Sequence, residues 1–238
     1  MNYFLIPGNP PAVHFYELWQ KEIMASDPKA EATVCSYPLL PKNSNSKKAI
    51  DDVLKYHEEQ FNHFQQKVSS PVTIIGHSLG GNFALRLLNR NHKLIEKVIL
   101  LHPFLRAPDI KGKIILKTVA ALYPYENFQK NIIKKRKLLE YLSAELPHVS
   151  NDEIEKSFHL AYHEHKIIAP DKTPLMIDHE FRDKVSVFFK RQDIWCTDAV
   201  IKDLKRQVSL FECTEPHGFV TEEKYRNSLF LKIKLQLS

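Results

Sequence analysis

Cysteine and glycine are scarce in this sequence, and it has no long apolar run. Its 238 residues hold six glycines and only three cysteines, which are Cys35, Cys196 and Cys213. Cysteines this few and this far apart exclude a disulfide framework and a paired-cysteine metal site, so we expect buried thiols in a reducing compartment. No stretch approaches the roughly 18 apolar residues that a membrane-spanning helix needs, so we expect no such helix.

The first residues and the net charge bear on location and partners. "MNYFLIPGNPP" lacks the basic segment of a signal peptide, so we expect a cytoplasmic protein. The net charge is +6, and the densest basic run is Lys134 to Lys137. Such a run is typical of the solvated side of a helix, and the alternative is a patch for anionic lipid or nucleic acid. Because no nucleic-acid motif accompanies it, we expect no nucleic-acid partner.

Short β-branched runs alternate with longer helical patterns. This alternation predicts an α/β fold with a mostly parallel sheet flanked by helices. Apolar stripes at helical spacing, such as Phe15, Trp19 and Ile23, predict the flanking helices. The expected strands are 2–7, 32–37, 72–76, 97–102, 185–190 and 207–212.

The alternation stops between Phe104 and Lys184, where helical patterns are broken by prolines. We therefore expect one core of residues 1–103 and 185–238, with a helical cap of residues 104–184 inserted between the later strands. A cap at the rim of the sheet would cover a ligand, and the alternative is that its aromatic residues form only a small core. These aromatic residues are Phe104, Tyr123, Tyr125, Phe128, Tyr141, Phe158, Tyr162 and Phe181.

Residues 76–80, "GHSLG", follow a buried-type strand and open a helix. This is the strand-turn-helix setting of a nucleophile elbow, in which a serine occupies a strained turn between small residues. Ser78 would then project at the helix N-terminus, where backbone N–H groups favour developing negative charge. The alternative is an ordinary turn between a strand and a helix.

A serine nucleophile needs a general base, and the base needs a carboxylate to fix its tautomer. In this fold both follow the serine, the acid first. His217 comes soon after the last expected strand, and Asp193 comes directly after the strand before it. We assign them as base and acid, although a surface-loop histidine and a solvated aspartate are alternatives and Asp198 is a rival acid.

The tetrahedral intermediate needs hydrogen-bond donors for its oxyanion. We expect the backbone N–H groups of Leu79 and Asn9 to supply them, because Pro10 and Pro11 have no N–H. A plain turn at residues 7–11 is the alternative.

A metal site is not expected. His159 and His163 stand four residues apart on an expected helix, but no carboxylate or cysteine follows at a metal-ligand interval, and no HExxH motif is present. We expect no metal and no organic cofactor.

The landmarks together resemble the α/β-hydrolases and, more narrowly, the lipid-droplet-associated hydrolases, which are serine lipid hydrolases. The resemblance rests on "FLIPGNP", "FYELW", "GHSLGG", "QDIWC" and "PHGF", spread from Phe4 to Phe219. It places nucleophile, acid and base on Ser78, Asp193 and His217, the residues already reached from the strand ends. Pro11 stands where the family tends to have glycine.

The sequence thus predicts a serine hydrolase that cleaves carboxylic esters of apolar, lipid-like substrates through an acyl-enzyme. The expected partners are a small-molecule or lipid ester and, peripherally, a lipid surface. The alternatives are an acyl-thioesterase and a catalytically inactive protein that binds a lipid surface.

Overall fold

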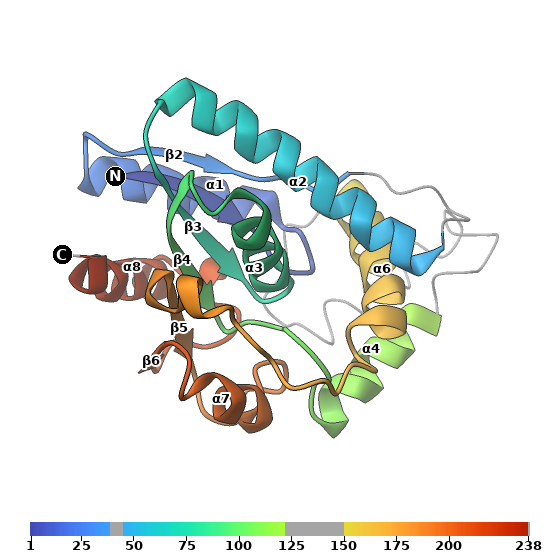
Figure 1. Cartoon of the computed structure of the whole chain (residues 1–238). Coiled ribbons are helices and arrows are strands. Elements are labelled where there is room, and N and C mark those ends of the chain that lie inside the picture. The colour runs from blue at the N-terminus through green and yellow to red at the C-terminus, as the bar shows by residue number, and fades with distance from the viewer. Residues whose placement is uncertain (39–44, 122–149, 238) are drawn as a thin grey trace.

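A computed structural model describes residues 1–38, 45–121 and 150–237 of the chain. It contains one sheet of six strands, all parallel, in the order β2-β1-β3-β4-β5-β6 (Figure 1). The expected α/β fold with a parallel sheet is therefore confirmed. The strands are β1 (Asn2–Ile6), β2 (Glu31–Val34), β3 (Val72–His77), β4 (Ile95–Leu101), β5 (Val185–Phe189) and β6 (Ser209–Glu212).

All six expected strands form, with shifted ends. The largest shift is in β2, which ends at Val34 rather than at Tyr37. The ladder continues only through the Cys35 N–H, which donates to Leu5 O at 2.8 Å. Beyond that point the side chain of Tyr37 is buried, so burial rather than strand pairing explains the apolar pattern there.

Helices cover both faces of the sheet. Successive residues of a strand point to opposite faces, and Tyr3 packs against Phe230 of α8 (Glu223–Leu237) while Phe4 packs against Phe61 of α2 (Ser46–Val68). Contacts place α1 (Val13–Ser26) with α8 on one face, and α3 (Leu79–Asn91) with α2 on the other. The core lies between these helices and the sheet. All three cysteines are buried in it as free thiols, as expected.

In the described part of the stretch between β4 and β5, the regular elements are helices. It forms α4 (Ile110–Ala121), α6 (Asn151–Ile167) and the short 3₁₀ helix η2 (His179–Lys184). Helices α4 and α6 pack side by side beyond the carboxyl ends of the strands, and α6 also contacts α2 (Figure 1). The division into a core and a cap of residues 104–184 stays a prediction. The basic run Lys134 to Lys137 and the aromatic residues Tyr123, Tyr125, Phe128 and Tyr141 lie outside the described residues.

No helix in the described parts of the chain is both long enough and apolar enough to cross a membrane.

Candidate active site

Ser78 occupies the sharp turn between β3 and α3. Its φ is 50° and its ψ is −118°, a strained combination for a residue with a side chain. The turn is possible because the residues two positions before and after Ser78 are glycines. A Cβ on Gly80 would lie 2.1 Å from the carbonyl oxygen of Ile6, and one on Gly76 would lie 2.6 Å from that of Gly80. The glycines of "GHSLG" therefore let helix and strand approach, which is the arrangement of a nucleophile elbow.

His217 lies on the loop after β6 and reaches Ser78. The Ser78 hydroxyl donates to Nε2 of His217, with Oγ and Nε2 3.0 Å apart. The loop is anchored two residues earlier by Glu215, whose buried carboxylate accepts hydrogen bonds from Ser228 and Lys232 of α8. Although burial alone would raise the pKa of Glu215, these hydrogen bonds outweigh it and lower that pKa. The anchor ties the histidine loop to the last helix.

Asp193 lies in the loop after β5 and completes a chain of hydrogen bonds. Nδ1 of His217 donates to its Oδ2 at 2.7 Å, while the backbone N–H groups of Trp195 and Cys196 donate to Oδ1 at 2.8 and 3.0 Å. The Asp193 side chain is 3% exposed, and burial by itself would raise its pKa. The electrostatic attraction of His217 and the hydrogen bonds outweigh burial, so the pKa lies below its ordinary value and the carboxylate stays charged. The rival Asp198 is exposed at the start of α7 (Asp198–Leu204).

The loop after β1 passes over Ser78. A Cβ on Gly8 would lie 2.8 Å from that of Ser78, so the loop needs a glycine here. The Gly8 N–H donates to the Tyr16 hydroxyl at 3.1 Å, and that hydroxyl in turn donates to Nδ1 of His77. Burial raises the pKa of Tyr16, which keeps the phenol protonated. The Gly8 N–H is therefore already hydrogen-bonded, and Pro10 and Pro11 have no N–H. Asn9 is the residue in this part of the loop whose N–H remains to bind an oxyanion.

Leu79 is the first residue of α3, where N–H groups have no partner within the helix. Its N–H directly follows Ser78, so it is the second donor that the local geometry offers. The assignment of Asn9 and Leu79 as an oxyanion hole stays a prediction.

Two further histidines lie beneath these side chains. His77 and His102 are buried, and burial lowers the pKa of both, that of His102 to about 3, so their rings are neutral. His102 Nδ1 lies 3.6 Å from Oδ2 of Asp193, which is too long for a hydrogen bond. Among the described residues, His102, Asp193 and His217 offer three metal-ligand atoms within 4.8 Å of one another. Two of these residues, His217 and Asp193, are already joined by a hydrogen bond between Nδ1 and Oδ2.

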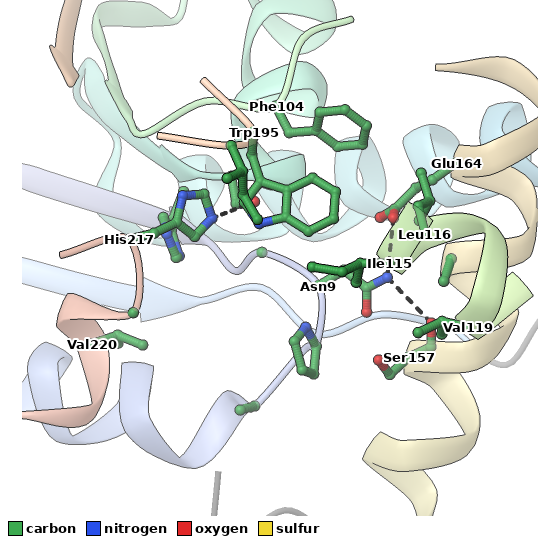
Figure 2. A pocket seen from close by; sticks show the side chains of 18 of the residues that line it. Asn9, Phe104, Ile115, Leu116, Val119, Ser157, Glu164, Trp195, His217 and Val220 are labelled. Carbon is green, nitrogen blue, oxygen red and sulfur yellow. Dashed lines mark hydrogen bonds between the residues drawn. The ribbon is translucent and has the colours of Figure 1, made fainter. Parts of the chain in front are cut away.

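Ser78 and His217 open into a cavity of about 370 Å³. Figure 2 shows His217 and Trp195 at one end and the residues of α4 and α6 at the other. Its wall is mainly apolar, with a few polar groups, as is common for ligand pockets. The apolar part of the wall includes Phe104, Ile115, Leu116, Val119, Trp195 and Val220.

Three polar residues of this site were not predicted from the sequence. Tyr16 was assigned only to a motif, although its hydroxyl connects the Gly8 loop to His77. Glu215 was not singled out. Glu164 lies within "HLAYHEH", where only the histidines were considered, yet it is the carboxyl group of that segment that lines the cavity. The signal available for Glu164 was that an acidic residue stands among the buried positions of an expected helix.

A family profile described as lipid-droplet associated hydrolase matches residues 1–123, which is a little more than half of the chain. The chain belongs to this family. No curated protein sequence matches the chain. The family membership confirms the resemblance inferred from the sequence motifs.

Solved structures with the same fold extend over the whole chain. A lipase-esterase related protein from Clostridium acetobutylicum is 15% identical, with a TM-score of 0.61 and coverage of 98% of this chain and 93% of that one. A hydrolase from Oleispira antarctica is 14% identical, with a TM-score of 0.64 and coverage of 100% and 91%. The Vlm2 thioesterase domain is 14% identical, with a TM-score of 0.61 and coverage of 98% and 92%. At these identities the likeness shows the fold, which is that of the α/β-hydrolases.

Proposed function

We propose that this member of the family is a serine hydrolase that cleaves carboxylic esters of apolar substrates through an acyl-enzyme. The observation that carries the proposal is the continuous hydrogen-bonded chain from Ser78 through His217 to Asp193 at one end of an apolar cavity. Each of the three residues follows a different strand, and their order along the chain is that of α/β-hydrolases.

The roles follow from the hydrogen bonds. His217 donates through Nδ1 to the Asp193 carboxylate, so its Nε2 is free to accept the Ser78 proton as Oγ attacks the ester carbonyl. The same proton then passes to the leaving alcohol, and a water molecule activated by His217 hydrolyses the acyl-enzyme. The N–H groups of Asn9 and Leu79 stabilise the oxyanion in both steps.

The cavity wall supports an apolar substrate class. Helices α4 and α6 contribute much of this wall, which supports a substrate-covering role for the cap. Removing apolar surface from water contributes about 25 cal/mol per Å², so an acyl chain gains affinity with each buried carbon. We expect kcat/KM to rise with chain length until the cavity is full.

A fluorophosphonate probe tests the mechanism. The wild-type protein should be labelled, and labelling should disappear in Ser78→Ala, while Ser70→Ala on the loop before β3 serves as the matched control and stays labelled. A folded wild-type protein that resists labelling would favour the inactive lipid-binding alternative. Esters of p-nitrophenol and acyl-CoA thioesters of graded chain length then separate an esterase from an acyl-thioesterase.

Peripheral contact with a lipid surface is a second proposal, carried by the outer face of α4. Ile110 and Ile114 are 76% and 61% exposed, and the exposed Lys111, Lys113 and Lys117 accompany them. Exposed apolar residues beside cations on a helix suit an anionic lipid surface, and contact there would be made from the cytoplasm. Ile114→Glu should weaken sedimentation with anionic vesicles, and unchanged sedimentation would exclude this face.

A further inference from the structure

The cavity has a polar group in its otherwise apolar far wall. Glu164 lies on α6 with Ser157 and Ala161, and all three side chains line the cavity from one face of that helix. Glu164 is 3% exposed. Figure 2 shows its carboxyl group pointing from α6 toward Asn9, above Leu116. The proposed mechanism does not use this group.

Asn9 holds one side of the Glu164 carboxyl group. Its Nδ2 donates to Oε2 of Glu164 and to the backbone oxygen of Ser157, both at 3.2 Å. Burial raises the pKa of Glu164 to about 8, against a smaller lowering by the Asn9 hydrogen bond, so the carboxyl group is protonated at neutral pH. Because Oε2 is the acceptor in this contact, the acid proton belongs on Oε1.

Two buried polar atoms of this pair have no partner among the described residues. They are Oε1 of Glu164, which carries the proton, and Oδ1 of Asn9. Buried polar groups in folded proteins are nearly always hydrogen-bonded, so an unmatched donor and an unmatched acceptor on one cavity wall indicate a missing polar partner. A hydroxyl group is a neutral partner that both accepts and donates. A cation fits less well, because the apolar wall would not replace its hydration.

We propose that Glu164 and Asn9 form a subsite that binds a hydroxyl group of the substrate, so that the preferred substrates are hydroxylated apolar esters. This inference rests on the proposed function and names its substrate class. The Ser78 end of the cavity holds the scissile ester, and the subsite binds the hydroxyl from the opposite wall. The hydroxyl belongs to the acyl chain or to the alcohol, and the two arms of the experiment separate these sources.

The experiment compares kcat/KM for matched esters with and without one hydroxyl. One arm uses p-nitrophenyl esters of hydroxylated and plain fatty acids of equal length, with the hydroxyl moved along the chain. The other uses hydroxypropyl esters against propyl esters. In one of these arms we expect the wild-type enzyme to prefer the hydroxylated ester by about tenfold, the effect of one buried hydrogen bond. A ratio of one in both arms would overturn the proposal.

Variants of the subsite test the assignment to Glu164. Glu164→Leu removes the donor and should bring the ratio to about one. Glu164→Gln keeps a donor and an acceptor, so it should retain part of the preference for the hydroxylated ester. The matched control is Glu153→Ala on the same helix. Glu153 accepts from the Val13 N–H at the start of α1 but does not line the cavity, so the ratio of this control should equal that of the wild type. An unchanged ratio in Glu164→Leu would overturn the proposal.

A pH series provides a second measurement if Glu164→Leu does not fold. Above the raised pKa of Glu164 the carboxylate cannot donate, so the wild-type ratio should fall above about pH 8, and that of Glu164→Gln should not. Other titratable groups near the cavity, which are Tyr16, Tyr37, His77 and His217, affect both esters and cancel in the ratio. A wild-type ratio that is independent of pH would count against the subsite.

Failure of the subsite differs from failure of the proposed function. If the wild type is labelled by fluorophosphonate and hydrolyses plain esters with a ratio of one, only the subsite is wrong. If it is neither labelled nor active on any ester, the proposed function is wrong.

Discussion

The raised pKa of Glu164 makes stability depend on pH in a way that one substitution removes. Its carboxyl group has an ordinary pKa of 4.5 and a pKa of about 8 in the folded protein, chiefly because it is buried. Between these values the unfolded chain has released a proton that the folded protein retains. The free energy of unfolding therefore falls as the pH rises, by about 1.4 kcal/mol for each pH unit.

The full difference between the two pKa values corresponds to about 5 kcal/mol. This is an upper limit, because water penetration and side-chain relaxation reduce the penalty of a buried charge. Between pH 5 and pH 9 the free energy of unfolding of the wild-type protein should fall by at most about 4 kcal/mol because of this group. In Glu164→Gln the neutral amide does not titrate, so this part of the loss should be absent.

Urea unfolding at intervals between pH 5 and pH 9 measures the effect. The quantity of interest is the difference between Glu164→Gln and the wild type, since every other titrating group is common to both. The difference should grow in favour of the variant as the pH rises and level off above about pH 8. Glu17→Gln makes the same substitution at an exposed position of α1 and should follow the wild type. Parallel curves for Glu164→Gln and the wild type would refute the reasoning.

Three other substitutions test the site. Asp193→Asn should lower kcat about 10³- to 10⁴-fold because the amide favours the wrong tautomer of the histidine, and Asp198→Asn should leave ester hydrolysis unchanged. Gly80→Ala forces a methyl group against a carbonyl oxygen of β1, so its thermal midpoint should fall by an amount equivalent to about 3 kcal/mol, and a normal midpoint would contradict the close packing. Glu215→Gln weakens the hydrogen bonds to Lys232, so the free energy of unfolding should fall by about 1–3 kcal/mol. The same variant should lower kcat more than it raises KM, and an unchanged kcat would show that the anchor is not needed.

Sequence periodicity predicted most of the fold because the sheet is parallel and buried on both faces. Strands of this kind appear as short apolar runs, so Val72–His77 and Ile95–Leu101 were recognised within two residues of their ends. The end of the second strand was missed, because Cys35 and Tyr37 are buried without being part of a strand. Burial and strand pairing leave the same apolar signature, and only the hydrogen bonds separate them.

The amino-acid sequence by itself determined the fold class, the family and the strained turn at Ser78, because local motifs and chain order carry that information. It also singled out Asp193 and His217 by their positions after strands. The tertiary structure decided which atoms meet: that the His217 ring lies 3.0 Å from Ser78 Oγ, and that Glu164 of a remote helix lies against Asn9. These contacts join residues 139 and 155 positions apart. No local pattern records such separations, because they arise only when the sheet and the inserted helices pack together.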